Sequence, residues 1–119
     1  MRRGHRGLRV WEEGLVLVEQ IYRVTRSFPS TEIYGLTAQM RRAAASVPSN
    51  IAEGYARAST RDLLRFLSIS AGSLSELDTL VELAQRLGFL NDTEELKARI
   101  EEVSGMLMGL QTALRKKLS

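Results

Sequence analysis

The sequence contains no cysteine and a single histidine, His5, among its 119 residues. Without cysteine there is no disulfide framework, no thiolate metal ligand and no cysteine nucleophile. One histidine excludes a metal site built from several histidines, and its place in an Arg-rich terminus argues against a Ser-His-Asp triad. The sequence also lacks the GxGxxG, Walker and HExxH motifs. We therefore predict a protein that is not an enzyme and that holds no metal and no cofactor.

Long apolar runs and strand patterns are missing as well. No uncharged apolar run approaches the ~18 residues of a membrane span, and no apolar stretch follows the basic start, so neither a membrane helix nor a signal peptide is expected. No segment alternates strictly between apolar and polar residues for as long as about six residues, the length of an ordinary strand. With 44% hydrophobic and 26% charged residues, the composition is that of a folded soluble domain. We predict one largely helical, cytoplasmic domain.

Charge is unevenly distributed along the chain. The net charge is +3, and 14 of the 17 basic residues are arginines. Residues 1–9 contain four arginines and no acidic residue, whereas residues 66–114 contain three basic and eight acidic residues. We predict a basic N-terminal tail over residues 1–9 and a bundle domain over residues 10–119. Clustered arginines favour an anionic partner, with nucleic acid the first candidate.

Helical periodicity covers almost the whole of the domain. Apolar residues at intervals of three and four predict helices from about Val10 to Phe28, Thr31 to Gly54, Ser59 to Leu87, and Asn91 to Lys116. The second helix contains Pro48, but its apolar stripe continues beyond it. Short loops between helices favour antiparallel neighbours. We therefore predict an all-α, antiparallel up-down four-helix bundle.

The third helix has two apolar seams, although a helix in a lone bundle needs only one. The first seam runs through Leu63, Leu67 and Leu74, and the second includes Phe66 and Ile69. Contiguous exposed apolar patches usually mark interfaces. We predict that one of the two seams packs against a second copy of the chain, although the pattern does not say which. The second seam supplies the candidate oligomer-interface residues Phe66, Ile69, Leu80 and Leu83.

Polar residues form a stripe beside the apolar one on the second helix and interrupt the second seam of the third. Such groups are costly to bury unless they are paired. We predict a structural polar network made of Gln39, Arg42, Asn50, Glu53, Ser73 and Glu76. The alternative, an acid–base pair formed by Glu53 and Glu76 in a hydrolase, requires a deep pocket around these two carboxylates.

The most distinctive run is residues 34–54, YGLTAQMRRAAASVPSNIAEG. It matches the signature YGLxxQxRRAxxSxPxNIAEG and resembles the family of 23S rRNA intervening-sequence proteins, also called four helix bundle proteins. Residues 65–67 and 71–77 add a second match, and the resemblance extends over about residues 8–118. The run is specific because its proline lies inside a predicted helix, a position that generic bundles avoid.

This resemblance implies an up-down four-helix bundle that assembles as a homopentamer. Members are encoded within bacterial 23S rRNA genes and elsewhere. The family is also similar to the accessory variability determinant proteins of diversity-generating retroelements, which bind nucleic acid through a basic surface and work with a reverse transcriptase. The resemblance thus implies a second copy of the chain, RNA or DNA, and a reverse transcriptase as candidate partners.

Two functional hypotheses follow from the sequence. The first is an oligomeric bundle that binds structured RNA or DNA through arginine–phosphate contacts, with Arg41, Arg57, Arg61 and Arg65 as candidate binding residues. The second is a protein-interaction scaffold that does not bind nucleic acid. The position of these arginines distinguishes the two, because binding requires them to converge on one surface without acidic partners that cover them.

Overall fold

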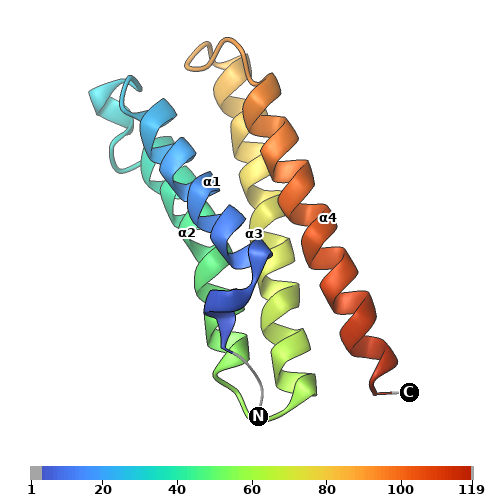
Figure 1. Cartoon of the computed structure of the whole chain (residues 1–119). Coiled ribbons are helices and arrows are strands. Elements are labelled where there is room, and N and C mark those ends of the chain that lie inside the picture. Colours follow the sequence, from blue (N-terminus) through green and yellow to red (C-terminus); the bar gives the residue numbers. More distant parts are fainter. Residues whose placement is uncertain (1–3, 119) are drawn as a thin grey trace.

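Four α-helices account for most of the computed structural model, which describes residues 4–118. They are α1 (Arg9–Thr25), α2 (Leu36–Tyr55), α3 (Thr60–Arg86) and α4 (Glu94–Lys116), with short 3-10 helices η1 (His5–Gly7) and η2 (Ser30–Glu32). No strand occurs in the described part of the chain. Each α-helix packs against its two neighbours in the chain order α1–α2–α3–α4–α1 (Figure 1). The predicted all-α four-helix bundle is confirmed.

The core lies along the bundle axis and follows the predicted periodicity. In the first seam of α3, Leu63 and Leu67 are completely buried and Leu74 is 2% exposed. Leu17 and Ile21 of α1 are completely buried as well. The other helices supply further buried residues at the same spacing: Met40, Val47, Ile51, Ile100, Val103 and Leu107. Full burial of one such side chain contributes ~1.5–3 kcal/mol. The first seam of α3 is therefore the one that faces the core.

The start of α2 differs from the prediction. The helix begins at Leu36 rather than at Thr31, because residues 30–32 form the separate turn η2. The Glu32 carboxylate then accepts a hydrogen bond of 3.0 Å from the backbone N–H of Leu36. A carboxylate at this position satisfies a free donor at the helix start and interacts favourably with the helix dipole.

Hydrogen bonds cap both ends of α3. The Ser59 hydroxyl accepts a hydrogen bond of 3.1 Å from the backbone N–H of Asp62. Gly88 follows the helix with a φ of 82°, the left-handed conformation that ends many helices. The backbone N–H of Phe89 closes this cap on the Ala84 carbonyl at 2.9 Å. These caps define the length of the longest helix in the bundle.

The signature run of α2 packs closely against both neighbouring helices. The helix continues through Pro48, as predicted, and Pro48 is buried against Gly14 of α1, where an added Cβ would lie 3.5 Å from the Pro48 Cβ. Gly54 faces α3, where an added Cβ would lie only 2.9 Å from the Leu63 Cδ1. Two glycines therefore line the close contacts of α2.

The part of the predicted basic tail that the structure describes, residues 4–9, is folded. Helix η1 contacts α1 and α2, and the His5 ring lies 4.9 Å from the Trp11 ring in an edge-to-face arrangement. Arg6 lies over the Trp11 ring at 5.5 Å, and Arg9 already belongs to α1. Arg2 and Arg3 lie outside the described residues, as does Ser119 of the predicted domain.

None of the helices in residues 4–118 combines the length and the apolar character that a bilayer crossing demands.

Candidate nucleic-acid interface

Hydrogen bonds between α2 and α3 determine which residues of the two helices face each other. The Ser46 and Ser73 hydroxyls lie 2.7 Å apart, and the Ser70 hydroxyl donates to the Val47 carbonyl. Because the helices are antiparallel, the C-terminal end of α2 lies beside the N-terminal end of α3. The short turn between them therefore brings Arg57 close to the first two turns of α3.

Three of the four predicted binding arginines gather at this turn. Arg57 follows α2, while Arg61 and Arg65 lie one turn apart on α3. The guanidinium carbons of Arg57 and Arg65 lie 4.8 Å and 4.7 Å from the centroid of the same ring, that of Phe66. Arg61 is exposed, and its side chain has no hydrogen-bond or ion-pair partner within residues 4–118.

Acidic residues accompany two of these arginines. Arg57 forms an ion pair of 2.9 Å with Glu53, and Arg65 lies 3.8 Å from Asp62. All four side chains are between 43% and 61% exposed. Exposed ion pairs of this kind contribute ~0–1 kcal/mol, so a competing anion can displace the carboxylates at little cost.

Arg41 lies away from this group, contrary to the expectation that the four arginines form one surface. Its Nε donates a hydrogen bond of 2.9 Å to the Thr25 hydroxyl, and its guanidinium lies 4.5 Å from the centroid of the Tyr22 ring. Both contacts are to the end of α1. Arg41 is thus ~24 Å further along the α2 axis than Arg57. Its contacts tie α2 to α1, which is a structural role.

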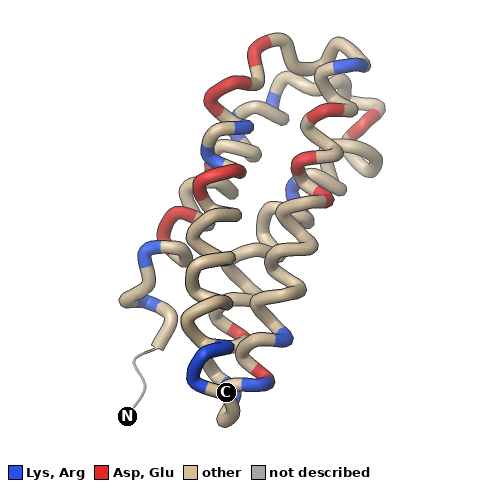
Figure 2. The backbone as a smooth tube through the Cα atoms, turned by 90° about the vertical axis from the view of Figure 1, so that its right-hand side faces the viewer, with Lys and Arg blue, Asp and Glu red and all other residues tan. Residues whose placement is uncertain are grey.

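The structure adds a second basic segment, at the C-terminal end of α4. The Gln111 side chain donates a hydrogen bond of 3.4 Å to the Ser68 hydroxyl, which sets α4 antiparallel to α3. The C-terminal end of α4, which contains Arg115, Lys116 and Lys117, therefore lies beside the start of α3. Figure 2 shows these residues grouped at the lower end of the bundle. No local pattern reveals this proximity.

The bundle is consequently polarised in charge along its length. The end that contains η1, the α2–α3 turn and the last turn of α4 has eight described basic residues and four acidic ones. The described remainder of the chain has seven basic and ten acidic residues. Most of those acidic residues lie on the halves of α3 and α4 that are distant from the basic end (Figure 2). We call the first of these regions, residues 4–13, 53–65 and 115–118, the basic end.

The predicted structural polar network forms only in part. The Asn50 amide donates at 2.8 Å to both the hydroxyl and the carbonyl of Ser46, and Ser46 in turn contacts Ser73. This chain of hydrogen bonds joins α2 to α3. The other predicted members are exposed within one chain, and of these Glu53 pairs with Arg57 at 2.9 Å. Three of them form no side-chain hydrogen bond or ion pair in the described chain: Gln39, Arg42 and Glu76.

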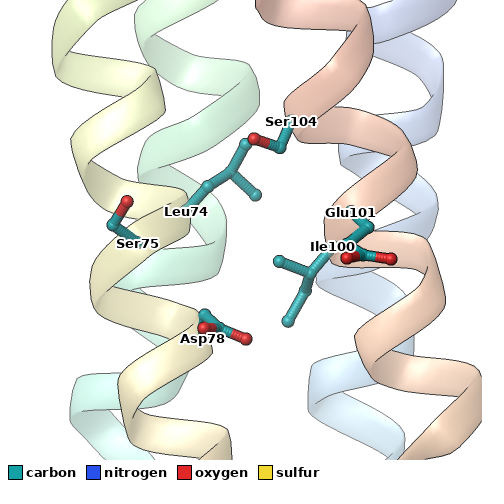
Figure 3. Close-up of a pocket in the computed structure, with 6 residues that line it drawn as sticks. All are labelled: Leu74, Ser75, Asp78, Ile100, Glu101 and Ser104. Atoms are coloured by element: carbon teal, nitrogen blue, oxygen red, sulfur yellow. The ribbon is translucent and has the colours of Figure 1, made fainter.

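Glu53 and Glu76 do not form a carboxylate pair within one chain. The hydrogen bonds between α2 and α3 place Glu53 beside a position on α3 that is about ten residues before Glu76. The two carboxylates are therefore separated by ~15 Å along the helix axis. A pocket lies instead between α3 and α4, where Asp78 and Glu101 flank the apolar side chains of Leu74 and Ile100 (Figure 3). Neither Glu53 nor Glu76 lines it. A hydrolase centred on these two residues therefore has no geometric support.

The candidate interface residues on α3 separate into two groups. Ile69 and Leu83 are each 43% exposed, and Phe66 is half-buried beneath two arginines. Leu80 is only 7% exposed and belongs to the core, because the seam turns inward at this position. Within a single chain, the outward part of the second seam is Ile69, Leu83 and the neighbouring Leu87, which is 54% exposed.

Metal ligands do not cluster in the described part of the chain, where no group of three His, Asp or Glu side chains could hold an ion. The absence of a metal and of a cofactor, like the absence of enzymatic activity, stays a prediction.

Comparison with known proteins agrees with the signature run. No curated protein matches the chain. A family model described as "23S rRNA-intervening sequence protein" matches residues 6–109, which include all four helices except the last turns of α4. The chain therefore belongs to the 23S rRNA-intervening sequence protein family.

Proposed function

We propose that this protein is an oligomeric helical bundle that binds structured RNA or DNA through arginine–phosphate contacts at the basic end. The observation that carries the proposal is that Arg57, Arg61 and Arg65 lie close to the basic residues at the C-terminal end of α4. These charges come from two parts of the chain that are about fifty residues apart, and the fold brings the two parts side by side. Phosphate contacts supply most of the sequence-independent affinity of nucleic-acid-binding proteins.

Assembly into a homopentamer is part of the same proposal. The resemblance supplies the number of subunits, and the exposed apolar residues Ile69, Leu83 and Leu87 on α3 supply a surface that a second copy can cover. Five copies repeat the basic end five times, so weak individual contacts add through avidity. A reverse transcriptase as partner, and a location in the cytoplasm, stay predictions.

The ion pairs of Arg57 with Glu53 and of Arg65 with Asp62 favour the second hypothesis, a scaffold that contacts only other proteins. The two hypotheses differ in the effect of salt. If several phosphates are neutralised, affinity for a labelled RNA hairpin falls about tenfold or more between ~50 and ~200 mM salt. A protein that shifts neither this hairpin nor a DNA duplex at low salt is the scaffold.

Charge reversal at the turn locates the binding surface. We expect the double variant Arg57→Glu/Arg61→Glu to weaken binding of unrelated sequences about equally, because phosphate contacts carry no sequence information. The matched control is Arg23→Glu/Arg26→Glu, which makes the same change in net charge at the opposite end of the bundle. Equal losses in the two variants contradict a surface at the basic end. A third variant without residues 1–9 measures the contribution of the N-terminal arginines, and loss of binding in that variant alone places the site there.

A further inference from the structure

Phe66 links the two elements that form the α2–α3 turn. The Arg57 guanidinium reaches its ring from the segment after α2, and the Arg65 guanidinium reaches it from α3, both at less than 5 Å from the centroid. Two like charges are thereby held less than about 10 Å apart, within one Debye length of each other at moderate salt. Each cation is attracted by the π face of this ring in addition to its own carboxylate partner, Glu53 for Arg57 and Asp62 for Arg65.

The position of the ring is set by the backbone beneath it. Gly54 lies so close to α3 that an added Cβ would be 3.0 Å from the Phe66 Cβ. Phe66 is half-buried, whereas the side chains of Arg57 and Arg65 remain substantially exposed. The base of the aromatic side chain is therefore held firmly while its cationic partners face solvent.

Stacking of this kind leaves an arginine well suited to a phosphate. A guanidinium that stacks on an aromatic face keeps its N–H donors in its own plane, where they can bind a phosphate in fork geometry. One such donor of Arg57 is bonded to the exposed Glu53 carboxylate at 2.9 Å, which a phosphate can replace. An arginine held by a ring also loses less side-chain entropy when an anion binds.

We infer that Phe66 is a positioning residue for phosphate binding, whose ring holds Arg57 and Arg65 as a clamp for the sugar–phosphate backbone of a nucleic acid. This inference rests on the proposed function. It differs from the interface role that the seam pattern of α3 suggests for Phe66, because it depends on the π face of the side chain and not on its apolar character.

The test compares Phe66→Leu, which keeps an apolar side chain, with Phe66→Tyr, which keeps the ring. We expect Phe66→Leu to weaken binding of a labelled RNA hairpin about tenfold at low salt, and Phe66→Tyr to bind as the wild type does. Ile33→Ala is the control, because it shortens an exposed apolar residue in the connection between α1 and α2, at the end of the bundle opposite to Phe66. Light scattering and thermal unfolding of each variant are measured alongside.

The outcomes separate this inference from the function on which it rests. A tenfold loss in Phe66→Leu, with assembly and melting temperature unchanged, supports the clamp. Wild-type affinity in Phe66→Leu overturns the clamp and leaves nucleic-acid binding intact, whereas a loss that accompanies dissociation of the assembly shows an interface role instead. A wild-type protein that binds no hairpin overturns the proposed function, and the clamp with it. In that case, ring-current shifts of the Arg57 and Arg65 Nε–H signals that vanish in Phe66→Leu still show that the contacts exist.

Discussion

Individual residues of the signature run have structural reasons for their identity. Asn50 bonds twice to Ser46 and so connects to Ser73 on α3. Pro48 packs against Gly14, and Gly54 allows α2 to approach Leu63. The signature thus contains the residues by which α2 packs against α1 and α3. The arginine contacts with Phe66 lie next to Gly54, the last residue of the signature.

Replacement of Gly54 tests the closeness of this contact. An alanine Cβ would lie 2.9 Å from the Leu63 Cδ1 and 3.3 Å from the Leu63 carbonyl oxygen, which cannot move without its helix. We expect Gly54→Ala to lower the free energy of unfolding by ~1–3 kcal/mol in chemical denaturation, because overpacking outweighs the better helix propensity of alanine.

The matched control for that substitution is Gly72→Ala. Gly72 also lies inside a helix, but an added Cβ there would meet nothing within 4 Å. Alanine should then stabilise the protein by up to ~1 kcal/mol. If the two variants have equal stability, close packing at Gly54 is not what requires the glycine.

At the scale of helix pairs, polar side chains add specific connections to the apolar packing of the core. Between α1 and α4, Arg99 donates at 2.7 Å to Glu13 and at 3.0 Å to Gln20. Between α3 and α4, Lys97 donates at 3.0 Å to Glu82, which also accepts from Arg86. The periodicity did not reveal either connection, since each joins residues on different helices.

The Glu82 cluster gives the α3–α4 pair a dependence on pH. Hydrogen bonds from Arg86 and then from Lys97 lower the pKa of Glu82 below its ordinary value. The Glu82 carboxylate therefore binds a proton less readily in the folded state than in the unfolded state. The cluster contributes its full stability at pH values above the pKa of an ordinary glutamate. That contribution is lost as the pH falls through the lowered pKa, in the region below about 4.3.

Unfolding of Glu82→Gln at two pH values measures this effect. We expect the variant to be less stable than the wild type at neutral pH and the difference to shrink at pH ~3. The control is Glu19→Gln, since Glu19 is exposed on α1 and has no ion pair within residues 4–118. A difference that persists undiminished in acid argues against the ion pairs as its cause.

For the whole molecule, the central question is how copies of the bundle meet. The structure distinguishes the two seams of α3, because Leu63 is completely buried within the chain while Ile69 is 43% exposed. The same substitution on the two seams should therefore have different consequences. This comparison also separates folding of one chain from assembly of several.

We expect the wild type to show about five times the 13.3 kDa of one chain in light scattering. Ile69→Asp should remain helical but dissociate, because a charge in a covered apolar patch is unpaired. Leu63→Asp should unfold, since the same charge then lies in the core. A monomeric wild type at micromolar concentration contradicts the pentamer, and a fully assembled Ile69→Asp places the interface elsewhere.

The sequence alone determined the number and type of the helices and the family of the chain. Periodicity located the core residues, and Ser59 and Gly88 marked the ends of α3, because these signals act over one or two helical turns. Local signals were less complete at the start of α2, where Glu32 caps a helix that the apolar stripe alone would begin at Thr31.

Only the tertiary structure decided which residues from distant segments share a surface. It directed the first seam of α3 into the core, separated Arg41 from Arg57, and brought the basic end of α4 beside the α2–α3 turn. It also placed two guanidinium groups over Phe66, which the pattern assigned to an apolar interface. The physical reason is that antiparallel packing pairs residues far apart in the sequence, and neither helical periodicity nor local charge carries information about that pairing.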